Sequence, residues 1–245
     1  MCRFLAVTFF FQILTFAFAI DGDADDNDDD DGLSKCDDVK PMSDFDSNKY
    51  FKKLKHLYVT HAKGGGRLGV CLKFHTSKDS SGTIGYNYEF NGNGKPAEWI
   101  KAYTANCTGT EDSGQKGKFS FSCTQKFDLD LESIKKDLLK EATSEEEKAE
   151  VEKGIKNTGE GDHKDEFPQN VTVLSTDYEK YALIHSCADM KIENKTYLVD
   201  NYVVFNVNKD AKLPEGAKQK FKEYKWEEDK FATREICNNK EEIKK

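Results

Sequence analysis

The feature that most constrains the fold of this chain is a series of short strand-like runs separated by turn sequences. The runs are rich in β-branched and aromatic residues, and clusters such as Gly64-Gly65-Gly66 and Asn91-Gly92-Asn93-Gly94 lie between them. The runs are residues 57–62, 68–76, 83–90, 99–107, 118–127, two within 171–187, and 197–207. Eight strands with meander-length turns and no βαβ spacing predict an all-β fold, either an up-and-down antiparallel barrel or a sandwich.

The clearest pair of strands lies within residues 171–187. Val171 and Val173 supply β-forming residues on one side, and Leu183 and Ile184 supply them on the other. A polar connection that begins Thr176-Asp177-Tyr178 joins the two runs. We therefore predict a β-hairpin with a tight turn.

The amino-terminal part is expected to lie outside the fold. Arg3 precedes an apolar run that ends at Ala17-Phe18-Ala19, which is typical of a cleaved secretory signal. The run is too short for a transmembrane anchor, so the mature protein should be secreted and should not span a membrane. We assign residues 1–19 to the signal peptide, 20–35 to an acidic disordered leader, and 36–245 to one domain.

The acidic leader distorts the charge of the chain. The net charge is −8, and eight aspartates lie between Asp21 and Asp31, so the remainder is close to neutral. Asn27 and Asp29 match part of a calcium-binding loop, but the twelfth position is Asp38 rather than Glu, which predicts weak and diffuse cation binding at most. No basic face is concentrated in the rest of the chain, and this argues against a nucleic-acid partner.

The cysteines fit an oxidising compartment. Removal of the signal peptide leaves six of them, which predicts three disulfides in a secreted chain. No C-x-x-C pair is present, so a zinc or redox site is not expected. Asn170 and Asn194 are candidate glycosylation sites, whereas Asn106 is a weaker candidate because Cys107 occupies the middle of its sequon.

Two segments have helical patterns. Residues 128–167 are highly charged, with Leu131, Ile134 and Leu138 at helical spacing, and form a helical insert between two strands. The insert is either a solvated excursion or an arm that binds a partner. After the last strand, Ala217 and Phe221 lie on one face of a helix that begins near Pro214, and this face should pack against the outside of the barrel.

No catalytic or metal site is predicted. His185, Ser186 and Asp189 contain the residue types of a hydrolytic triad, but adjacent strand residues point to opposite faces, so His185 and Ser186 cannot act together. Cys187 is expected to form a disulfide rather than serve as a nucleophile. The histidines, which are His56, His61, His75, His163 and His185, show no metal-ligand spacing. The chain is therefore not expected to be an enzyme.

One strand carries an aromatic face. Tyr86, Tyr88 and Phe90 alternate along residues 83–90 and share one side of the strand. They either line a cavity for a small ligand or form ordinary core, and both readings stay open.

Several motifs together resemble the salivary lipocalins of blood-feeding triatomine bugs, the group of triabin, pallidipin, procalin and the nitrophorins. They are the signal sequence, the opening C-D-D-V-K-P-M-S-D-F-D-S-N-K-Y-F, the strand H-L-Y-V-T-H and the hairpin T-D-Y-E-K-Y-A-L-I-H-S-C. The resemblance implies an eight-stranded antiparallel up-and-down lipocalin barrel with a C-terminal α-helix and the charged insert between strands E and F. It also implies the disulfides Cys36–Cys187, Cys71–Cys237 and Cys107–Cys123.

Two departures from the family pattern bear on the site. The usual G-x-W at the start of the first strand is Lys55-His56-Leu57 here, which leaves less bulk at the closed end. The segment that matches a haem-ligating strand of nitrophorins reads Tyr86-Asn87-Tyr88 and has no histidine, so haem is disfavoured and no cofactor is expected. The cavity candidates are Tyr86, Tyr88, Phe90 and Leu57.

The resemblance implies a monomeric salivary protein that sequesters a small host mediator, an eicosanoid or a biogenic amine, in its barrel. Such capture would restrain platelet aggregation and impair haemostasis. One alternative is a protein-protein inhibitor of a coagulation protease that acts through surface loops, the insert or the acidic leader. Another is a salivary lipocalin with no ligand.

Overall fold

A computed structural model describes residues 35–64, 66–97, 99–158, 162–192 and 195–238. The predicted signal peptide, all of the acidic leader except Lys35, and Asn194 lie outside the described residues. The main strands are β1 (His56–Ala62), β2 (Leu72–Lys78), β3 (Ile84–Phe90), β4 (Ile100–Glu111), β5 (Lys118–Leu129), β6 (Asp162–Thr176), β7 (Tyr181–Ile192) and β8 (Lys195–Asn206).

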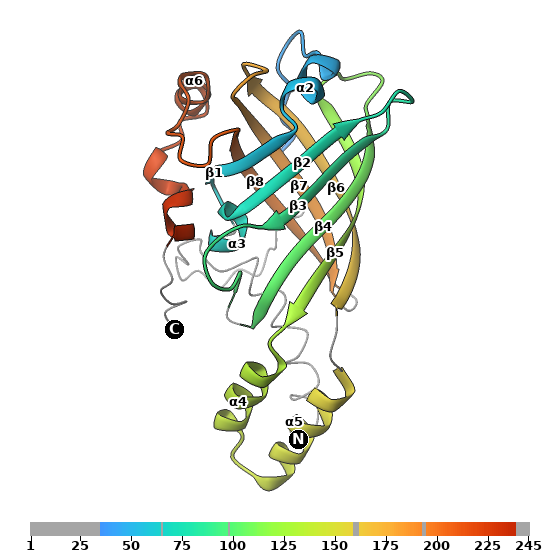
Figure 1. The fold of residues 1–245 in the computed structure, drawn as a ribbon, viewed down its shortest axis with the longest axis vertical. Helices are drawn as coiled ribbons and strands as arrows, with labels where there is room; N and C mark the ends of the chain where they lie inside the picture. The colour runs from blue at the N-terminus through green and yellow to red at the C-terminus, as the bar shows by residue number, and fades with distance from the viewer. Residues whose placement is uncertain (1–34, 65, 98, 159–161, 193–194, 239–245) are drawn as a thin grey trace.

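The strands form a closed antiparallel barrel (Figure 1). Each strand from β2 to β7 pairs with the next along the chain, and β1 closes the ring by pairing with both β8 and β2. The predicted barrel is therefore confirmed, and the sandwich is excluded. The seam between β1 and β2 is short, with three paired positions, whereas β7 and β8 pair from Tyr181–Asn206 to Ile192–Lys195.

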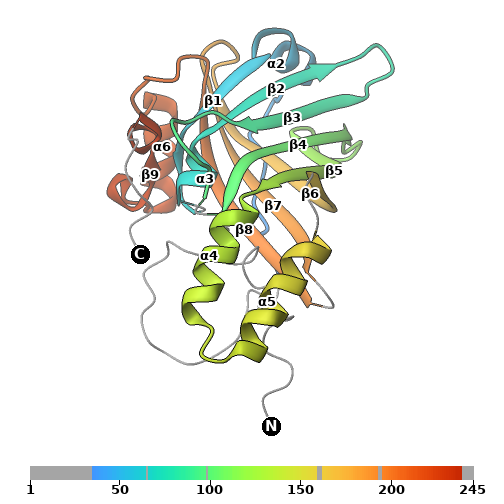
Figure 2. The same cartoon turned by 60° about the horizontal axis from the view of Figure 1, so that its bottom comes forward.

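Helices mark the two ends of the barrel. The short helix α2 (Ser47–Lys53) lies at one end, and α4 (Leu131–Glu141) and α5 (Glu145–Thr158) project from the opposite end (Figures 1 and 2). We call these the closed end and the mouth. The helical insert between the fifth and sixth strands is thus present, although β5 extends to Leu129 and β6 begins at Asp162, so the insert is shorter than 128–167.

The C-terminal part runs along the outside of the barrel. It contains α6 (Glu215–Tyr224), η1 (Glu228–Lys230), the short strand β9 (Ala232–Thr233) paired with β1, and η2 (Arg234–Asn238). Ala217 and Phe221 of α6 are buried in a second hydrophobic cluster with Leu174, Leu183 and Val204. As the sequence predicted, this helix packs against the outer face of the barrel.

One predicted strand begins too early. The sequence predicted a strand over residues 68–76, but the helical turn α3 (Gly66–Val70) precedes β2. The turn requires close backbone approach, because a Cβ on Gly69 would lie only 2.6 Å from the carbonyl oxygen of Gly64. Glycines at these positions allow the chain to fold back over the mouth instead of extending as a strand.

Aromatic rings fill the closed end. Phe51 lies 5.0 Å from Tyr50 and 5.6 Å from Phe119, measured between ring centroids, and both contacts are edge-on. Phe45 joins this cluster at 5.8 Å from Phe119. Leu57, which the resemblance places at the position of the lipocalin tryptophan, is completely buried in the same core cluster. These rings therefore supply the bulk that the sequence suggested was missing at this end.

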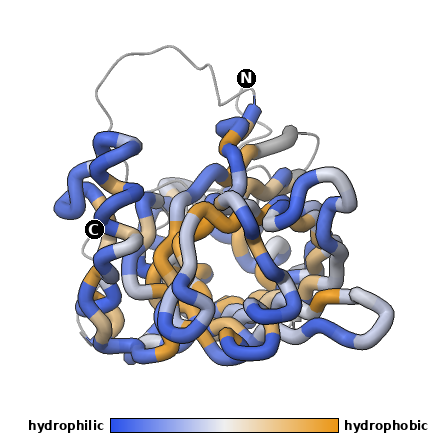
Figure 3. Tube along the Cα trace, turned by 90° about the horizontal axis from the view of Figure 1, so that it is seen from above, coloured by the Kyte–Doolittle hydropathy of each residue, from blue (hydrophilic) through white to orange (hydrophobic). Residues whose placement is uncertain are grey.

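Seen from above, the strands run round a ring with hydrophobic stretches, and much of the outer chain is hydrophilic (Figure 3). Among the described residues, three disulfides brace this ring, and they are the three pairs that the family resemblance implies. Cys36–Cys187 ties the amino-terminal segment to β7, Cys71–Cys237 ties the start of β2 to the C-terminal segment, and Cys107–Cys123 joins β4 to β5.

Candidate ligand-binding site

The mouth half of the barrel contains a cavity of about 90 Å³. Strands β6, β7 and β8 form much of its wall, and α3 contributes Leu68 and Gly69 at the rim. Alternation along the strands directs the lining side chains inward. The larger and the polar side chains around the cavity are Leu68, Phe74, Tyr88, Tyr103, Phe167, Gln169, Ser186, Met190, Asn201 and Phe205.

Gln169 and Ser186 form a polar pair within this apolar wall. Gln169 Nε2 donates a hydrogen bond to Ser186 Oγ at 2.8 Å. Gln169 Oε1 lies 3.4 Å from Cys123 Sγ, but a disulfide sulfur carries no hydrogen, so this contact is not a hydrogen bond. Within the described residues no N–H or O–H group donates to Gln169 Oε1, which is therefore available to a ligand hydroxyl or amide.

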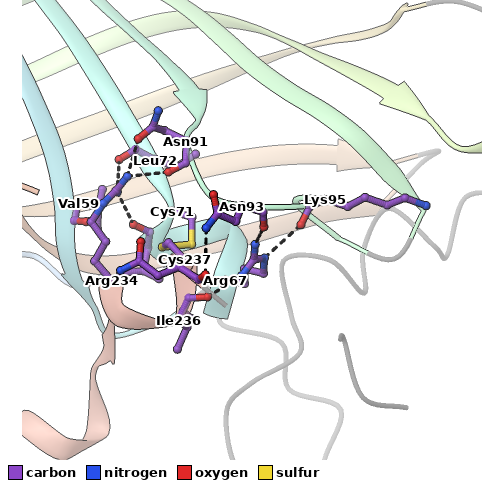
Figure 4. Close-up of a disulfide and its surroundings, with 12 residues drawn as sticks. Val59, Arg67, Cys71, Leu72, Asn91, Asn93, Lys95, Arg234, Ile236 and Cys237 are labelled. Atoms are coloured by element: carbon purple, nitrogen blue, oxygen red, sulfur yellow. Dashed lines mark hydrogen bonds between the residues drawn. A yellow bond between two sulfur atoms is a disulfide. The ribbon is translucent and has the colours of Figure 1, made fainter. Parts of the chain in front are cut away.

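The loop that carries α3 roofs the cavity and is held by directed hydrogen bonds. Asn201 clamps Gly64: the Gly64 N–H donates to Asn201 Oδ1, and Asn201 Nδ2 donates to the Gly64 carbonyl, each at 2.9 Å. Arg67 of α3 donates to the carbonyl oxygens of Asn93, Lys95 and Ile236 (Figure 4). The roof is thus attached to β8, to the segment after β3 and to the C-terminal segment.

The cavity is electrically neutral. Among the described residues that line it, none carries a formal charge. Burial raises the pKa of Tyr88 to about 12 and also raises the pKa values of Tyr86 and Tyr103 well above their ordinary value, so these phenols stay protonated. A protonated amine inside the cavity would lack a counter-ion and would be costly to desolvate.

The structure separates the four cavity candidates. Tyr88 lines the cavity, but Tyr86 stacks on Phe121 at 5.0 Å, and Leu57 is part of the closed-end core. Phe90 is half-buried, and the guanidinium of Arg67 lies 5.5 Å from its ring centroid. Sequence reasoning missed Gln169, Ser186 and Asn201. The sequence signal for such a residue is a polar side chain at an inward position of a strand. In β6, Gln169 occupies such a position between the inward apolar residues Phe167 and Val171.

The residues that resembled a triad face different environments. Ser186 lines the cavity, whereas His185 Nε2 lies 2.6 Å from Asp200 Oδ1 among buried side chains outside the barrel. Asp200 Oδ2 accepts from the Asp37 N–H at 2.8 Å, and Tyr202 donates to Asp37 Oδ2 at 2.6 Å. This network fastens the amino-terminal segment beside Cys36–Cys187 and has a structural role.

The two glycosylation candidates within the described residues are exposed on strands. Asn170 is exposed on β6, where its Oδ1 accepts from Ser120 Oγ at 2.9 Å. Asn106 is exposed on β4, and Asn194 lies outside the described residues. Glycosylation stays a prediction. In the part of the chain that the structure describes, no helix is long and apolar enough to cross a membrane.

A closed eight-stranded antiparallel barrel with a roofed mouth and a C-terminal helix on its outer face defines a lipocalin. The family model named Triabin matches residues 31–143 and 139–220. The chain belongs to this family, and its predicted membership of the triatomine salivary lipocalins is confirmed.

Individual relatives agree with this assignment. Pallidipin of Meccus pallidipennis is 28% identical over 206 residues, which cover 83% of this chain and 87% of the relative. Dipetalodipin of Dipetalogaster maximus is 24% identical over 205 residues, with 82% and 86% covered. A solved structure described as a biogenic amine-binding protein selenomethionine derivative has a TM-score of 0.50 and 15% identity, with 85% and 91% covered, and this likeness shows the fold.

Proposed function

We propose that this protein is secreted in saliva and captures a small, largely apolar host mediator of the eicosanoid class, thereby restraining haemostasis. The observation that carries the proposal is the uncharged cavity at the mouth, with an aromatic wall and polar groups at Gln169, Ser186 and Asn201. An apolar wall with a few placed polar groups is typical of small-molecule sites. Membership of a salivary lipocalin family supports secretion.

The charge of the cavity favours an eicosanoid over a biogenic amine. The hydrocarbon chain of an eicosanoid would contact Phe74, Phe167 and Met190, while its hydroxyl or keto groups would hydrogen-bond to Gln169 and Ser186. Its carboxylate would stay at the hydrated rim. A protonated amine would find no carboxylate among the described lining residues. The shared fold with an amine-binding protein does not decide between them.

The ligand must enlarge the cavity on entry. Its volume of about 90 Å³ is well below the roughly 300–1,000 Å³ of ordinary ligand pockets. Met190 can change rotamer readily, and Leu68 lies on the roof, whose backbone is held to β8 by the two hydrogen bonds between Asn201 and Gly64. We therefore expect binding to displace α3 and to proceed more slowly than simple diffusion.

Calorimetry against a panel of eicosanoids and biogenic amines tests the proposal. We expect one-to-one binding of an eicosanoid and no heat with the amines. Ala188 lines the cavity, so Ala188→Leu should fill it and abolish binding, whereas Ala102→Leu on the exposed face of β4 should bind normally. If Ala188→Leu still binds the ligand, the cavity at the mouth is not the binding site. If no compound in the panel gives a heat of binding, ligand capture is not the function.

The projecting helices favour a second candidate, inhibition of a coagulation protease. Ile134 and Val151 are the buried residues of α4 and α5, so most of this arm faces solvent (Figure 2). Replacing residues 131–158 with a short Gly-Ser linker separates the two functions. If the linker variant loses anticoagulant activity but still binds the eicosanoid, the arm is supported as a protease-inhibiting surface. If the linker variant prolongs clotting as much as the native chain does, the arm is excluded as that surface.

A further inference from the structure

Two histidines that are distant in sequence face each other on the outside of the barrel. His56 of β1 and His75 of β2 are direct cross-strand partners, and their Nδ1 atoms lie 2.9 Å apart. The ring centroids are 4.8 Å apart, and the rings are almost perpendicular, at 83°. His56 is exposed, and the side chain of His75 is 41% exposed, so water and solutes reach both rings.

The backbone explains this proximity. The Thr76 N–H donates to the Lys55 carbonyl at 2.9 Å, which makes Lys55 and Thr76 a hydrogen-bonded pair. Because such pairs alternate along an antiparallel ladder, His56 and His75 occupy the adjacent non-hydrogen-bonded position, where side chains approach most closely. Their neighbours Leu57 and Phe74 point into the buried core and hold the backbone in place. The two rings are therefore preorganised as a pair.

We propose that His56 and His75 chelate a divalent transition-metal ion of the Cu²⁺ or Ni²⁺ type through their Nδ1 atoms. With metal–nitrogen distances of about 2.0–2.1 Å, ligands at a right angle are separated by about 2.9 Å and tetrahedral ligands by about 3.3 Å. The observed 2.9 Å separation, which is also an ordinary hydrogen-bond distance, is compatible with the right angle of square-planar or octahedral coordination. Tetrahedral Zn²⁺ requires the rings to separate further.

The neighbouring charges set the strength and orientation of this site. Glu89 Oε1 lies 3.8 Å from His75 Nε2, where its carboxylate favours a proton on Nε2 and leaves Nδ1 free for a metal. Lys73 Nζ lies 3.7 Å from the same carboxylate and reduces the local negative charge. No cluster of three or more metal-ligating side chains occurs among the described residues, so water completes the coordination shell and the affinity is moderate.

Metal binding would reinforce the shortest seam of the barrel. The β1–β2 ladder has three paired positions, and the histidine pair is the outermost of them. A metal that binds this folded pair and not the unfolded chain raises the thermal midpoint. Protons compete for the imidazole nitrogens, so binding should weaken on acidification. This metal site does not depend on the ligand in the barrel. The spacing of the histidines in the sequence predicted no metal site, so the proposal differs from that expectation.

Titration of the mature, untagged chain with CuCl₂ or NiCl₂ at neutral pH tests the site. We expect one saturable equivalent by calorimetry, two nitrogen ligands in the Cu²⁺ EPR spectrum, and a metal-dependent rise in melting temperature. His56→Asn combined with His75→Asn should weaken binding at least tenfold and remove the rise. Ser77→Ala, on the same exposed face of β2, should behave as the native chain.

The double variant also controls for other ligands. It retains the acidic leader and the terminal amine, so any metal bound there is present equally in both proteins. Both histidines are solvent-accessible, and circular dichroism of the disulfide-intact variants verifies folding. Unchanged affinity in the double variant, or no saturable uptake by the native chain, would overturn the proposal and leave the contact as a hydrogen bond between the two rings.

Discussion

The closed end and the mouth of this barrel are stabilised in different ways. At the closed end, the rings of Phe45, Tyr50, Phe51 and Phe119 pack against one another. At the mouth, a small cavity remains, and the roof depends on hydrogen bonds from Asn201 and Arg67 and on one disulfide. Aromatic packing dominates the closed end, whereas the mouth combines the buried side chains of Leu68 and Val70 with directed hydrogen bonds around a cavity. Changes at the two ends should therefore have different consequences.

The largest effect is expected at the closed end. Phe51 is 5% exposed and contacts two aromatic rings, so Phe51→Ala should lower the free energy of unfolding by about 3–5 kcal/mol. Urea denaturation with intact disulfides measures this change. Ligand affinity should not change while the barrel remains folded. Phe51→Leu is the control and should cost less. A loss below about 1 kcal/mol for Phe51→Ala would contradict the role assigned to packing.

The next effect concerns Arg234 at the mouth. Its guanidinium donates to the carbonyl oxygens of Val59, Val70 and Leu72 at 3.2, 3.2 and 3.0 Å, and to both oxygens of Asn91 (Figure 4). Arg234→Met leaves buried acceptors without donors and should cost about 3 kcal/mol. Lysine cannot reproduce the planar fork, so Arg234→Lys should restore only part of this loss. If Arg234→Met and Arg234→Lys were equally stable in chemical denaturation, the directed hydrogen bonds of Arg234 would not be the source of its stabilisation.

A smaller effect is expected from loosening the roof. Asn201→Ala removes both hydrogen bonds to Gly64 and should cost about 1–2 kcal/mol. Hydrogen exchange of residues 63–70 should become faster, while exchange at α2 should not change. Asn201→Asp retains an acceptor for the Gly64 N–H and should show an intermediate rate. If hydrogen exchange became faster by the same factor at the roof and at α2, the mouth and the closed end would not open independently.

The smallest effect is a pH dependence at the base of the projecting arm. Asp130 caps α4, and its hydrogen bonds, first from Lys95 and then from Ser133, lower the pKa of its carboxyl from 3.8 to about 2. Because the folded pKa is depressed, the stabilisation is complete above about pH 4 and is lost as the pH falls towards 2.

This anchor is worth about 1 kcal/mol, because the Lys95 side chain is 43% exposed. Hydrogen exchange in α4, compared with α2 between pH 5 and 2, measures the change. Asp130→Asn should reproduce the acid state at neutral pH and should have a flatter profile. Identical pH profiles for the native chain and this variant would remove Asp130 as the titrating group.

Sequence patterns predicted the fold well because they reflect local physics. Strand alternation and turn residues place most of the strands, and the spacing of Ala217 and Phe221 predicted the buried face of α6. The same reasoning failed over residues 68–70, because a run with Leu68 and Val70 reads as a strand unless the backbone approach at Gly69 is known. Strand ends shifted for a related reason: pairing with a neighbour extends β6 back to polar residues that have no strand pattern.

The candidate site was less accessible to sequence reasoning. Alternation correctly placed Tyr86 and Tyr88 inside the barrel, but it does not say how far along the barrel axis each lies. Tyr86 contributes to the packed half and Tyr88 to the cavity. The histidine pair is 19 residues apart in sequence, so only the register of β1 and β2 brings it together. Contacts set by strand register across a barrel leave no local trace.

The disulfide connections also govern what happens when the backbone is cut. Cys36 is bonded to Cys187, and Cys71 to Cys237, so the two closed loops overlap along the chain. A protease that cleaves any one peptide bond between Cys36 and Cys237 leaves two fragments that a disulfide still joins. A nick in the exposed turn between α4 and α5 would be invisible on a non-reducing gel. The molecule could therefore lose continuity of its chain among host proteases and persist as one particle.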